Sequence, residues 1–238
     1  APMVVNPAWR LVWALSTLKD AQDNITLDGY LDHMVPLSEE NLRRIDAVPM
    51  EFEAMRQRWG LDRWINGISD HEARRRHLGA PTITICGIHS GYGGAGSKTV
   101  LPAEAAAKLD FRLVNGLTSK LAHDLLRQHL DRRGFTDITI KDLGAEEFAA
   151  SAPGELPERA AIAASQATWG KTPVMLPWYA GSGPMHPFDA VLGQPLIFAG
   201  ATWHPNARVH SPNENIFVKD YFGSMRFTAS FIEHFAVL

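Results

Sequence analysis

His210 is the side chain of this sequence best placed for metal chemistry, because it stands in a polar segment, 208–214, just before a long apolar stretch. Histidine is the commonest metal ligand in proteins, and His186 and His204 stand in nearby segments. A catalytic zinc ion, however, typically takes three protein ligands. Carboxylates that would join such a site are sparse: Asp189, Glu214 and Asp220. The residues alone leave two interpretations, an ordinary surface histidine and one ligand of an incomplete metal site.

The glycine-rich segment 90–99 is the second candidate. A phosphate-binding loop of the Walker type needs a Gly-Lys-Ser/Thr sequence after four variable residues. Here Ser97 separates Gly96 from Lys98, so the spacing disfavours nucleotide binding. The loop can instead present Thr99 and backbone N–H groups to a small anionic or carbonyl ligand. A purely structural hairpin loop is the alternative.

Two further segments imitate catalytic motifs without matching them. A zincin helix needs histidines four residues apart, whereas His71 and His77 are six apart and would lie about 240° apart around a helix. This spacing predicts a solvated, charged helix. A nucleophile elbow needs glycines two residues before and after the serine, and Ser182 has Ala180 and Pro184 there. Ser182 is therefore better suited to donate its hydroxyl to a bound ligand than to attack one.

Composition narrows the class of protein. The 238 residues are 45% hydrophobic, which is enough for one large domain or two small ones. The net charge of −3 argues against a nucleic-acid partner. The apolar stretch 11–18 is too short to span a membrane, and the start at Ala1 shows no basic region of a signal peptide. A single cysteine fits a reducing compartment. We expect a cytoplasmic protein, processed or cut from a longer chain.

The first part of the sequence predicts helices and strands that would position these candidates. Asn6-Pro7 is a helix start, and apolar spacing predicts a helix over 7–19. Further helices are expected from residue 38, over 52–59, and from Thr118 to Gly134. Strands are expected over 82–88, 105–114 and 136–140. This order suits an α+β layer, an antiparallel sheet with helices on one face.

The pattern changes after residues 144–157, which are typical of a linker. A helix is expected over 158–169 and a closing helix over 217–235. Short apolar runs at 174–178 and 195–199 predict strands, each followed by a glycine-containing loop. The C-terminal part therefore has α/β character.

Five segments, taken in order, resemble one enzyme family. They are Asn6-Pro7-Ala8-Trp9, 87–102, Phe111-Arg112-Leu113-Val114, 180–184 and 209–214. Together they resemble the dinuclear-zinc aminoacylase/carboxypeptidase family, and within it the carnosinase-type dipeptidases. The likeness extends over nearly the whole chain.

The resemblance implies an α+β lid joined to the C-terminal part of an α/β catalytic domain. It assigns 1–145 to the lid, which mediates dimerisation in the family, and 146–238 to the catalytic domain. His210 matches the family's last zinc-ligand histidine, and Arg112 matches an arginine that clamps the substrate's carboxylate. Thr99 matches a lid threonine that reaches substrate, in some members across the dimer. Ser182 matches a serine of the carboxylate pocket.

The departures from the family pattern decide the prediction for this chain. The family's other metal ligands, its glutamate general base and the lid's His-Ser-Gly motif have no counterpart here, because they precede the matched segments. His89-Ser90-Gly91 has the same letters but lies on a later strand, and Tyr179 falls near a family glutamate. We therefore expect no catalytic residue in this chain.

The sequence thus predicts a fragment of a zinc-dependent exopeptidase, with two zinc ions in the parent enzyme. Its substrate would be a dipeptide or N-acyl amino acid, hydrolysed at an amide bond next to a free carboxylate. The isolated chain is expected to be inactive and metal-free. The alternative is a non-catalytic dimerisation or substrate-binding module, which would pair with a second copy through an edge strand. We expect a homodimer through the lid, with no membrane partner.

Overall fold

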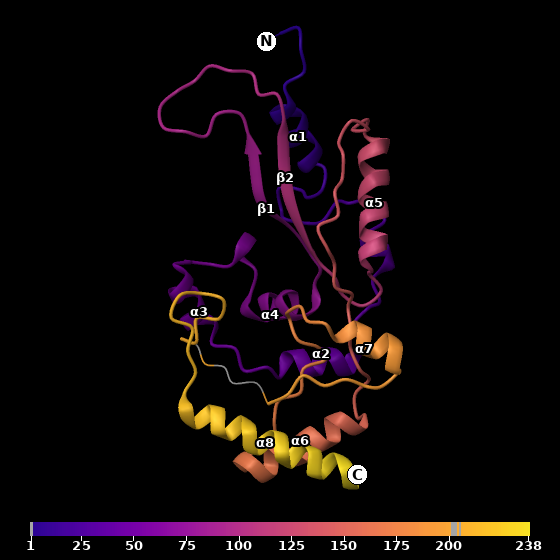
Figure 1. The fold of residues 1–238 in the computed structure, drawn as a ribbon, viewed down its shortest axis with the longest axis vertical. Helices are drawn as coiled ribbons and strands as arrows, with labels where there is room; N and C mark the ends of the chain where they lie inside the picture. Colours follow the sequence, from indigo (N-terminus) through magenta and orange to yellow (C-terminus); the bar gives the residue numbers. More distant parts are fainter. Residues whose placement is uncertain (1, 201–203, 205) are drawn as a thin grey trace. The chain divides into compact units, whose positions relative to one another are not determined.

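The computed structural model describes residues 2–200, 204 and 206–238 (Figure 1). The chain divides into two compact units, Ala1–Leu37 with Phe52–Phe148, and Ser38–Glu51 with Ala149–Leu238. The polypeptide therefore passes between the units after Leu37, Glu51 and Phe148. The domain division at 145/146 stays a prediction, and the compact units differ from it in placing the segment Ser38–Glu51 with the C-terminal part.

The first helix, α1 (Pro7–Leu15), begins as the sequence predicts and ends earlier. The Asn6 side chain accepts the N–H of Ala8 at 2.9 Å, which satisfies one of the free donors at the helix start. At the other end, the hydroxyls of Ser16 and Thr17 donate to the carbonyls of Trp13 and Ala14 at 2.9 and 2.7 Å. These bonds compete with helical N–H donors, so the helix expected to reach residue 19 stops at Leu15.

Within the first unit, the short 3₁₀ turn Leu31–His33 is followed by α3 (Phe52–Trp59) and α4 (Asp70–Gly79). A second 3₁₀ turn, Ile65–Gly67, stands between them. Trp64 Nε1 donates to Asp70 at 2.6 Å, and the Arg56 guanidinium lies 5.2 Å from the centre of a Trp64 ring. Helix α4 confirms the helical interpretation of the segment that holds His71 and His77.

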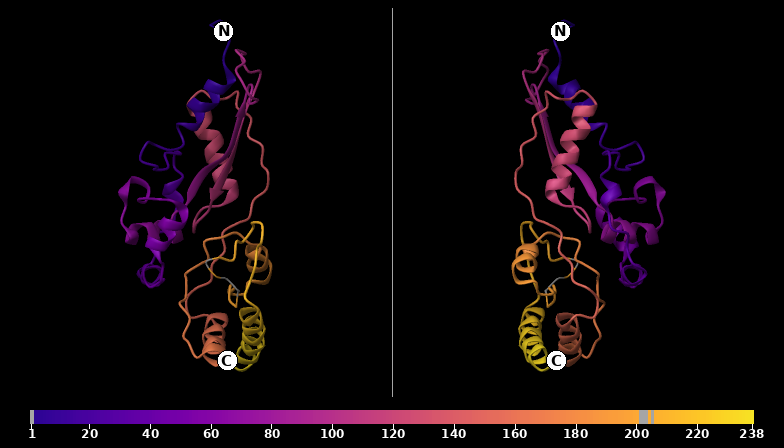
Figure 2. Two further views of the ribbon diagram at one scale, coloured as in Figure 1. Left: turned by 90° about the vertical axis from the view of Figure 1, so that its left-hand side faces the viewer. Right: turned by 90° about the vertical axis from the view of Figure 1, so that its right-hand side faces the viewer.

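The sheet of the first unit is the antiparallel pair β1 (Thr82–Ser90) and β2 (Ala105–Arg112), with a bulge between Ile85 and Gly87. Helices α1 and α5 (Ser119–Arg132) cover one face of this ribbon (Figure 2), as the sequence predicts. Thr118 caps α5 by accepting the N–H of Leu121. The buried side chains that join helices and sheet form one cluster: Ala14, Leu18, Leu27, Tyr30, Ile83, Val114, Leu117, Ala122, Leu126, Leu130 and Phe135.

The strand expected over 136–140 does not form, so that prediction is wrong. Ile138 and Ile140 pack against the cluster as a strand would place them. Two backbone carbonyls here accept hydrogen bonds from a side chain and not from a strand, because the Arg127 guanidinium donates to the carbonyls of Phe135 and Ile138. Apolar alternation predicts which side chains turn inward, but a strand also needs a neighbouring strand for its hydrogen bonds.

The second unit holds α2 (Glu39–Asp46), α6 (Leu156–Trp169), α7 (Met185–Leu192) and α8 (Val218–Val237). Helices α6 and α8 lie side by side (Figure 2) and bury a small cluster of Ala161, Ala164 and Phe227. The strands expected over 174–178 and 195–199 are wrong. These runs stay unpaired in the described part of the chain, and the N–H of Leu196 donates to Ser151 Oγ instead of to a strand.

Helix α2 is held in the second unit by a bidentate ion pair. The Arg44 guanidinium donates to both carboxylate oxygens of Glu158 at 2.9 and 3.0 Å, and its Nε donates to Glu40. Ile45, the next residue, is completely buried. In the described residues, no helix is both long and apolar enough to cross a membrane.

Candidate functional site

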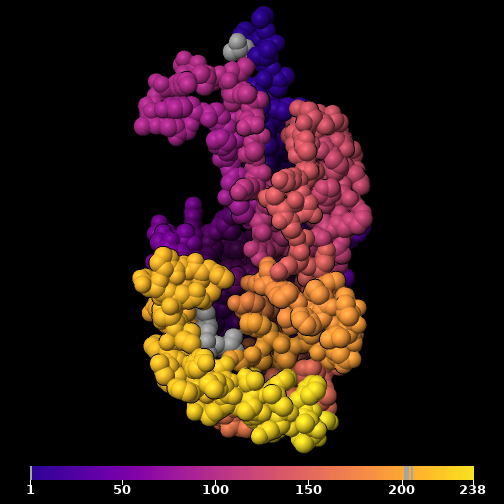
Figure 3. Space-filling view, viewed as in Figure 1, coloured from indigo at the N-terminus to yellow at the C-terminus, as the bar shows by residue number. Residues whose placement is uncertain are grey.

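The two candidates of the first unit lie at opposite ends of the β1–β2 hairpin. Thr99 is exposed in the loop that joins the strands, and Arg112 is the last residue of β2, opposite Thr82. The loop stands clear of the strands in Figure 3. Eight strand residues, about 25 Å of chain, separate the loop from Arg112. The structure therefore does not bring Thr99 and Arg112 of one chain to the same small ligand.

The Arg112 guanidinium already contacts a carboxylate within the chain. Its Nε donates to Asp110 Oδ2 at 2.7 Å, from two residues earlier on the same face of β2. The side chain is half exposed. A guanidinium carries five N–H donors in a fixed fork, so a substrate carboxylate has to share these donors with Asp110 or displace it.

Ser182 lies in the second unit, exposed in the loop before α7. The neighbouring Gly181 donates its N–H to the Tyr179 carbonyl at 2.9 Å. The Tyr179 ring stacks on Phe198 with centroids 4.8 Å apart, and both rings are exposed. Ser182 is thus next to an aromatic surface, with a glycine on each side.

His210 lies in an exposed loop of unusual backbone conformation. Arg208, His210 and Asn213 all have positive φ, between 54° and 64°, which non-glycine residues rarely adopt. Asn215 closes the loop, because its side-chain amide donates to the carbonyls of Asn206 and Asn213 at 3.1 and 3.0 Å. Clusters of strained residues are typical of functional sites. This geometry is compatible with a ligand role for His210.

The described residues do not by themselves form a catalytic metal site. No group of three or more His, Cys, Asp or Glu side chains in the described part of the chain is arranged to hold a metal ion. The polar contact at His210 is its backbone N–H, which donates to Glu214 at 3.3 Å. His204 is engaged with Asn215 at 3.0 Å. A zinc ion bound at His210 would need ligands from outside these residues.

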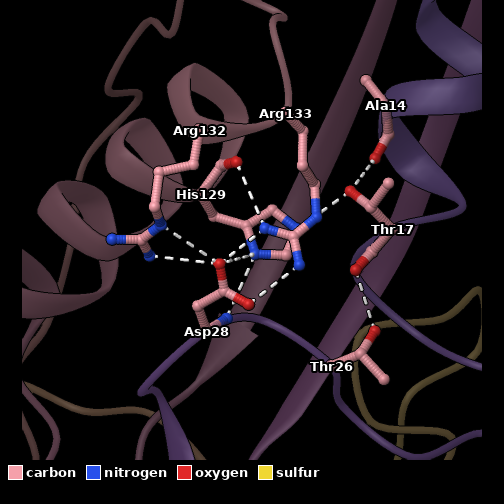
Figure 4. A network of polar contacts seen from close by, with 7 residues as sticks. All are labelled: Ala14, Thr17, Thr26, Asp28, His129, Arg132 and Arg133. Atoms are coloured by element: carbon pink, nitrogen blue, oxygen red, sulfur yellow. Dashed lines mark hydrogen bonds and ion pairs between the residues drawn. The ribbon is translucent and has the colours of Figure 1, made fainter.

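The most connected polar cluster was not singled out from the sequence. His129 on α5 contacts Thr17 and Asp28, and Asp28 also accepts from Arg132 and Arg133 (Figure 4). The signal in the sequence was its position on the inward face of α5, three residues after Leu126 and one before Leu130.

The connection Thr17–His129–Asp28 has the order of a catalytic triad but the wrong proton arrangement. Nδ1 of His129 accepts the backbone N–H of Asp28 at 3.1 Å, so Nδ1 carries no hydrogen. Nε2 therefore carries the hydrogen and donates to Thr17 Oγ1 at 2.9 Å. A general base needs a free lone pair toward the nucleophile. His129 cannot take a proton from Thr17, and the cluster holds the fold together.

Comparison with known proteins decides the family. The model of the peptidase dimerisation domain of M20 enzymes matches residues 1–137, more than half of the chain. The chain belongs to this family. The lid resemblance found from the sequence is therefore confirmed.

Curated relatives include two kinds of dipeptidase. A Beta-Ala-His dipeptidase of Rattus norvegicus is 28% identical over 241 residues, which cover 95% of this chain and 47% of that protein. A Cys-Gly metallodipeptidase of Candida albicans is 27% identical over 128 residues, covering 54% of this chain and 26% of that protein. The chain spans about half the length, or less, of the curated relatives it matches.

Solved structures agree with the fold. The M20 family metallo-carboxypeptidase from Sulfolobus solfataricus has a TM-score of 0.89 and 28% identity, and the match covers 100% of this chain and 54% of that one. Human carnosine dipeptidase 1 has a TM-score of 0.78 at 24% identity, covering 99% of this chain and 50% of that one. The lid with helices on one face of an antiparallel sheet is thus the fold of M20 peptidases.

Proposed function

We propose that this chain forms the lid and the C-terminal part of the catalytic domain of a zinc-dependent exopeptidase. Such an enzyme would hydrolyse the amide bond of a dipeptide or N-acyl amino acid next to its free carboxylate. The observation that carries the proposal is the family match over residues 1–137, together with a likeness to a metallo-carboxypeptidase that covers the whole chain.

The candidate residues would then have separate tasks. Arg112 and Ser182 would bind the substrate's carboxylate, and His210 would hold one of two zinc ions whose chemistry is to activate water. Thr99 would reach the substrate bound by a second copy, because the length of β2 separates it from Arg112 of its own chain. The remaining zinc ligands and the general base would come from outside the described residues.

The test is hydrolysis of Cys-Gly and β-Ala-His by the purified 238-residue chain with added zinc. We expect no hydrolysis and no zinc binding tighter than micromolar in a calorimetric titration, because a lone histidine is a weak site. His210→Ala should leave both results unchanged. Hydrolysis that disappears in His210→Ala would show that the chain is itself an enzyme and would contradict the proposal of an inactive fragment.

A second candidate function, a non-catalytic dimerisation module, is favoured by the match to a dimerisation domain. Within the described residues β1 pairs only with β2, and pairing through its other edge would place exposed Ile85 and Ile88 near a second copy. We expect light scattering to give twice the monomer mass for the native chain and the monomer mass for an Ile85→Lys, Ile88→Lys variant, because a charge on an edge strand opposes pairing. A monomeric native chain at all concentrations would exclude this function.

A further inference from the structure

His129 is completely buried at a point where three separate segments of the first unit meet (Figure 4). It projects from α5, its Nε2 contacts Thr17 just after α1, and its Nδ1 contacts the loop at Asp28. Thr17 in turn donates to the Ala14 carbonyl at 2.7 Å and accepts at its own carbonyl from Thr26 at 2.8 Å. Of these bonds, the one from the Asp28 N–H to Nδ1 requires a neutral imidazole with its hydrogen on Nε2.

Protonation would change one bond and leave the others. A proton on Nδ1 turns that nitrogen from acceptor to donor, so the Asp28 N–H loses its partner. Asp28 Oδ2 lies 3.3 Å from Nδ1 and would accept the new N–H. We propose that His129 is an acid-sensitive lock, which holds the 26–30 loop on α5 when neutral and releases its backbone when protonated.

The charged groups around His129 set the direction of this change. Burial lowers the pKa of His129, the guanidiniums of Arg133 and Arg132 lower it further, and the Asp28 carboxylate raises it. From the α1 side, Thr17 and Ala14 bring no charge. As the pH falls below about 6.5, His129 takes its proton in the unfolded chain before it does so in the folded chain. The stabilisation that neutral His129 gives the folded state therefore declines below that pH.

A change in the 26–30 loop would affect the core of the first unit. Leu27 and Tyr30, on either side of Asp28, are both buried in the core cluster of the first unit. A backbone shift at Asp28 therefore disturbs the packing between the loop, β2 and α5. The expected consequence is a local loss of protection at the Asp28 amide in mild acid, while the ion pairs of the Asp28 carboxylate with Arg132 and Arg133 keep the loop on α5.

The test is amide hydrogen exchange with ¹⁵N-histidine spectra of the full chain between pH 5 and 7.5. We expect an Nε2–H tautomer at pH 7 and a rise of about tenfold in Asp28 exchange, corrected for intrinsic rate, as His129 takes its proton. His129→Asn keeps an acceptor near the Nδ1 position and cannot titrate, so its Asp28 exchange should not depend on pH. His123→Asn, an exposed position on the same helix, is the matched control and should behave as the native chain.

Two results would overturn the lock. One is an Nδ1–H tautomer at pH 7, because the Asp28 N–H could then never donate to it. The other is the same pH dependence of Asp28 exchange in the native chain and in His129→Asn. If His129→Asn does not fold, the native chain alone still tests the lock. Its tautomer at pH 7 must be Nε2–H, and Asp28 exchange and the ¹⁵N signals of His129 must change over the same pH range.

Discussion

The two units differ in how much of their apolar surface they bury. Among the residues that the structure describes, eleven buried side chains form the core cluster of the first unit, against three in the cluster between α6 and α8 of the second. Large apolar side chains of α8 stay exposed in the structure, among them Tyr221, Phe222, Met225, Ile232 and Phe235. Burial of apolar area is the main stabilising term in folding. The second unit therefore has the smaller buried apolar cluster in the described residues, and loss of a large side chain from that cluster should have a large effect.

Phe227→Ala should have the largest effect, because Phe227 contributes most of the second unit's cluster and stacks on Trp169 at 5.1 Å. We expect a loss of about 3–5 kcal/mol in the free energy of unfolding of that unit. Hydrogen exchange by mass spectrometry should rise in α6 and α8 and stay unchanged in α5. Phe222→Ala, half exposed on the same helix, is the control, with a change below about 0.5 kcal/mol.

Glu158→Ala should separate α2 from the second unit. The substitution leaves the Arg44 guanidinium without its bidentate partner, at side-chain exposures of 15% for both residues. We expect about 2–3 kcal/mol of destabilisation, somewhat less than for a fully buried pair, with faster exchange in α2. Glu40→Ala removes the more exposed partner of the same arginine and should change urea unfolding by less than about 1 kcal/mol. Equal effects of the two variants would show that the bidentate geometry is unimportant.

Asp28→Asn tests the polar cluster that Asp28 forms with His129, Arg132 and Arg133 in the first unit. Hydrogen bonds from Arg133 lower the pKa of Asp28 well below its ordinary value. Its stabilisation is therefore complete above the unfolded pKa, about 3.9, and declines as the pH falls below it. The variant should lose about 1–2 kcal/mol at pH 7, allowing for partial solvent exposure. Its urea midpoint should fall less steeply than that of the native chain between pH 4 and 2.

Asn215→Ala should have the smallest effect on global stability, below about 1 kcal/mol, because its hydrogen bonds lie in an exposed loop. The effect should be local. Backbone relaxation measurements should show greater motion at His210 and Asn213, which loses the donor to its carbonyl. Unchanged order there would mean that the positive-φ loop is held by other contacts.

The sequence predicted those features that short-range chemistry determines. The caps at Asn6 and Thr118 and the inward face of α5 follow from local signals. The strands expected at 136–140, 174–178 and 195–199 failed, because a strand exists only where another strand accepts its bonds. For the site, the placement of Thr99 in the loop and Arg112 on the following strand agrees with the strands that the sequence predicts, and the extended length of β2 separates the two residues. The polar cluster at His129 could not be read from spacing, because Thr17 and Asp28 come from segments far from α5 in the sequence.

The Arg44–Glu158 pair also bears on the order in which the chain is made. Its two residues are 114 positions apart, and ribosomes add about 5–20 residues per second. Helix α2 is therefore synthesised roughly 6–23 seconds before the carboxylate that anchors it. During that interval the rest of the second unit, which buries Ile45 in the folded chain, has not been made. The first unit can meanwhile begin to fold, with the segment Ser38–Glu51 between its two parts still unpacked. The second unit can be completed only after the first has been translated in full.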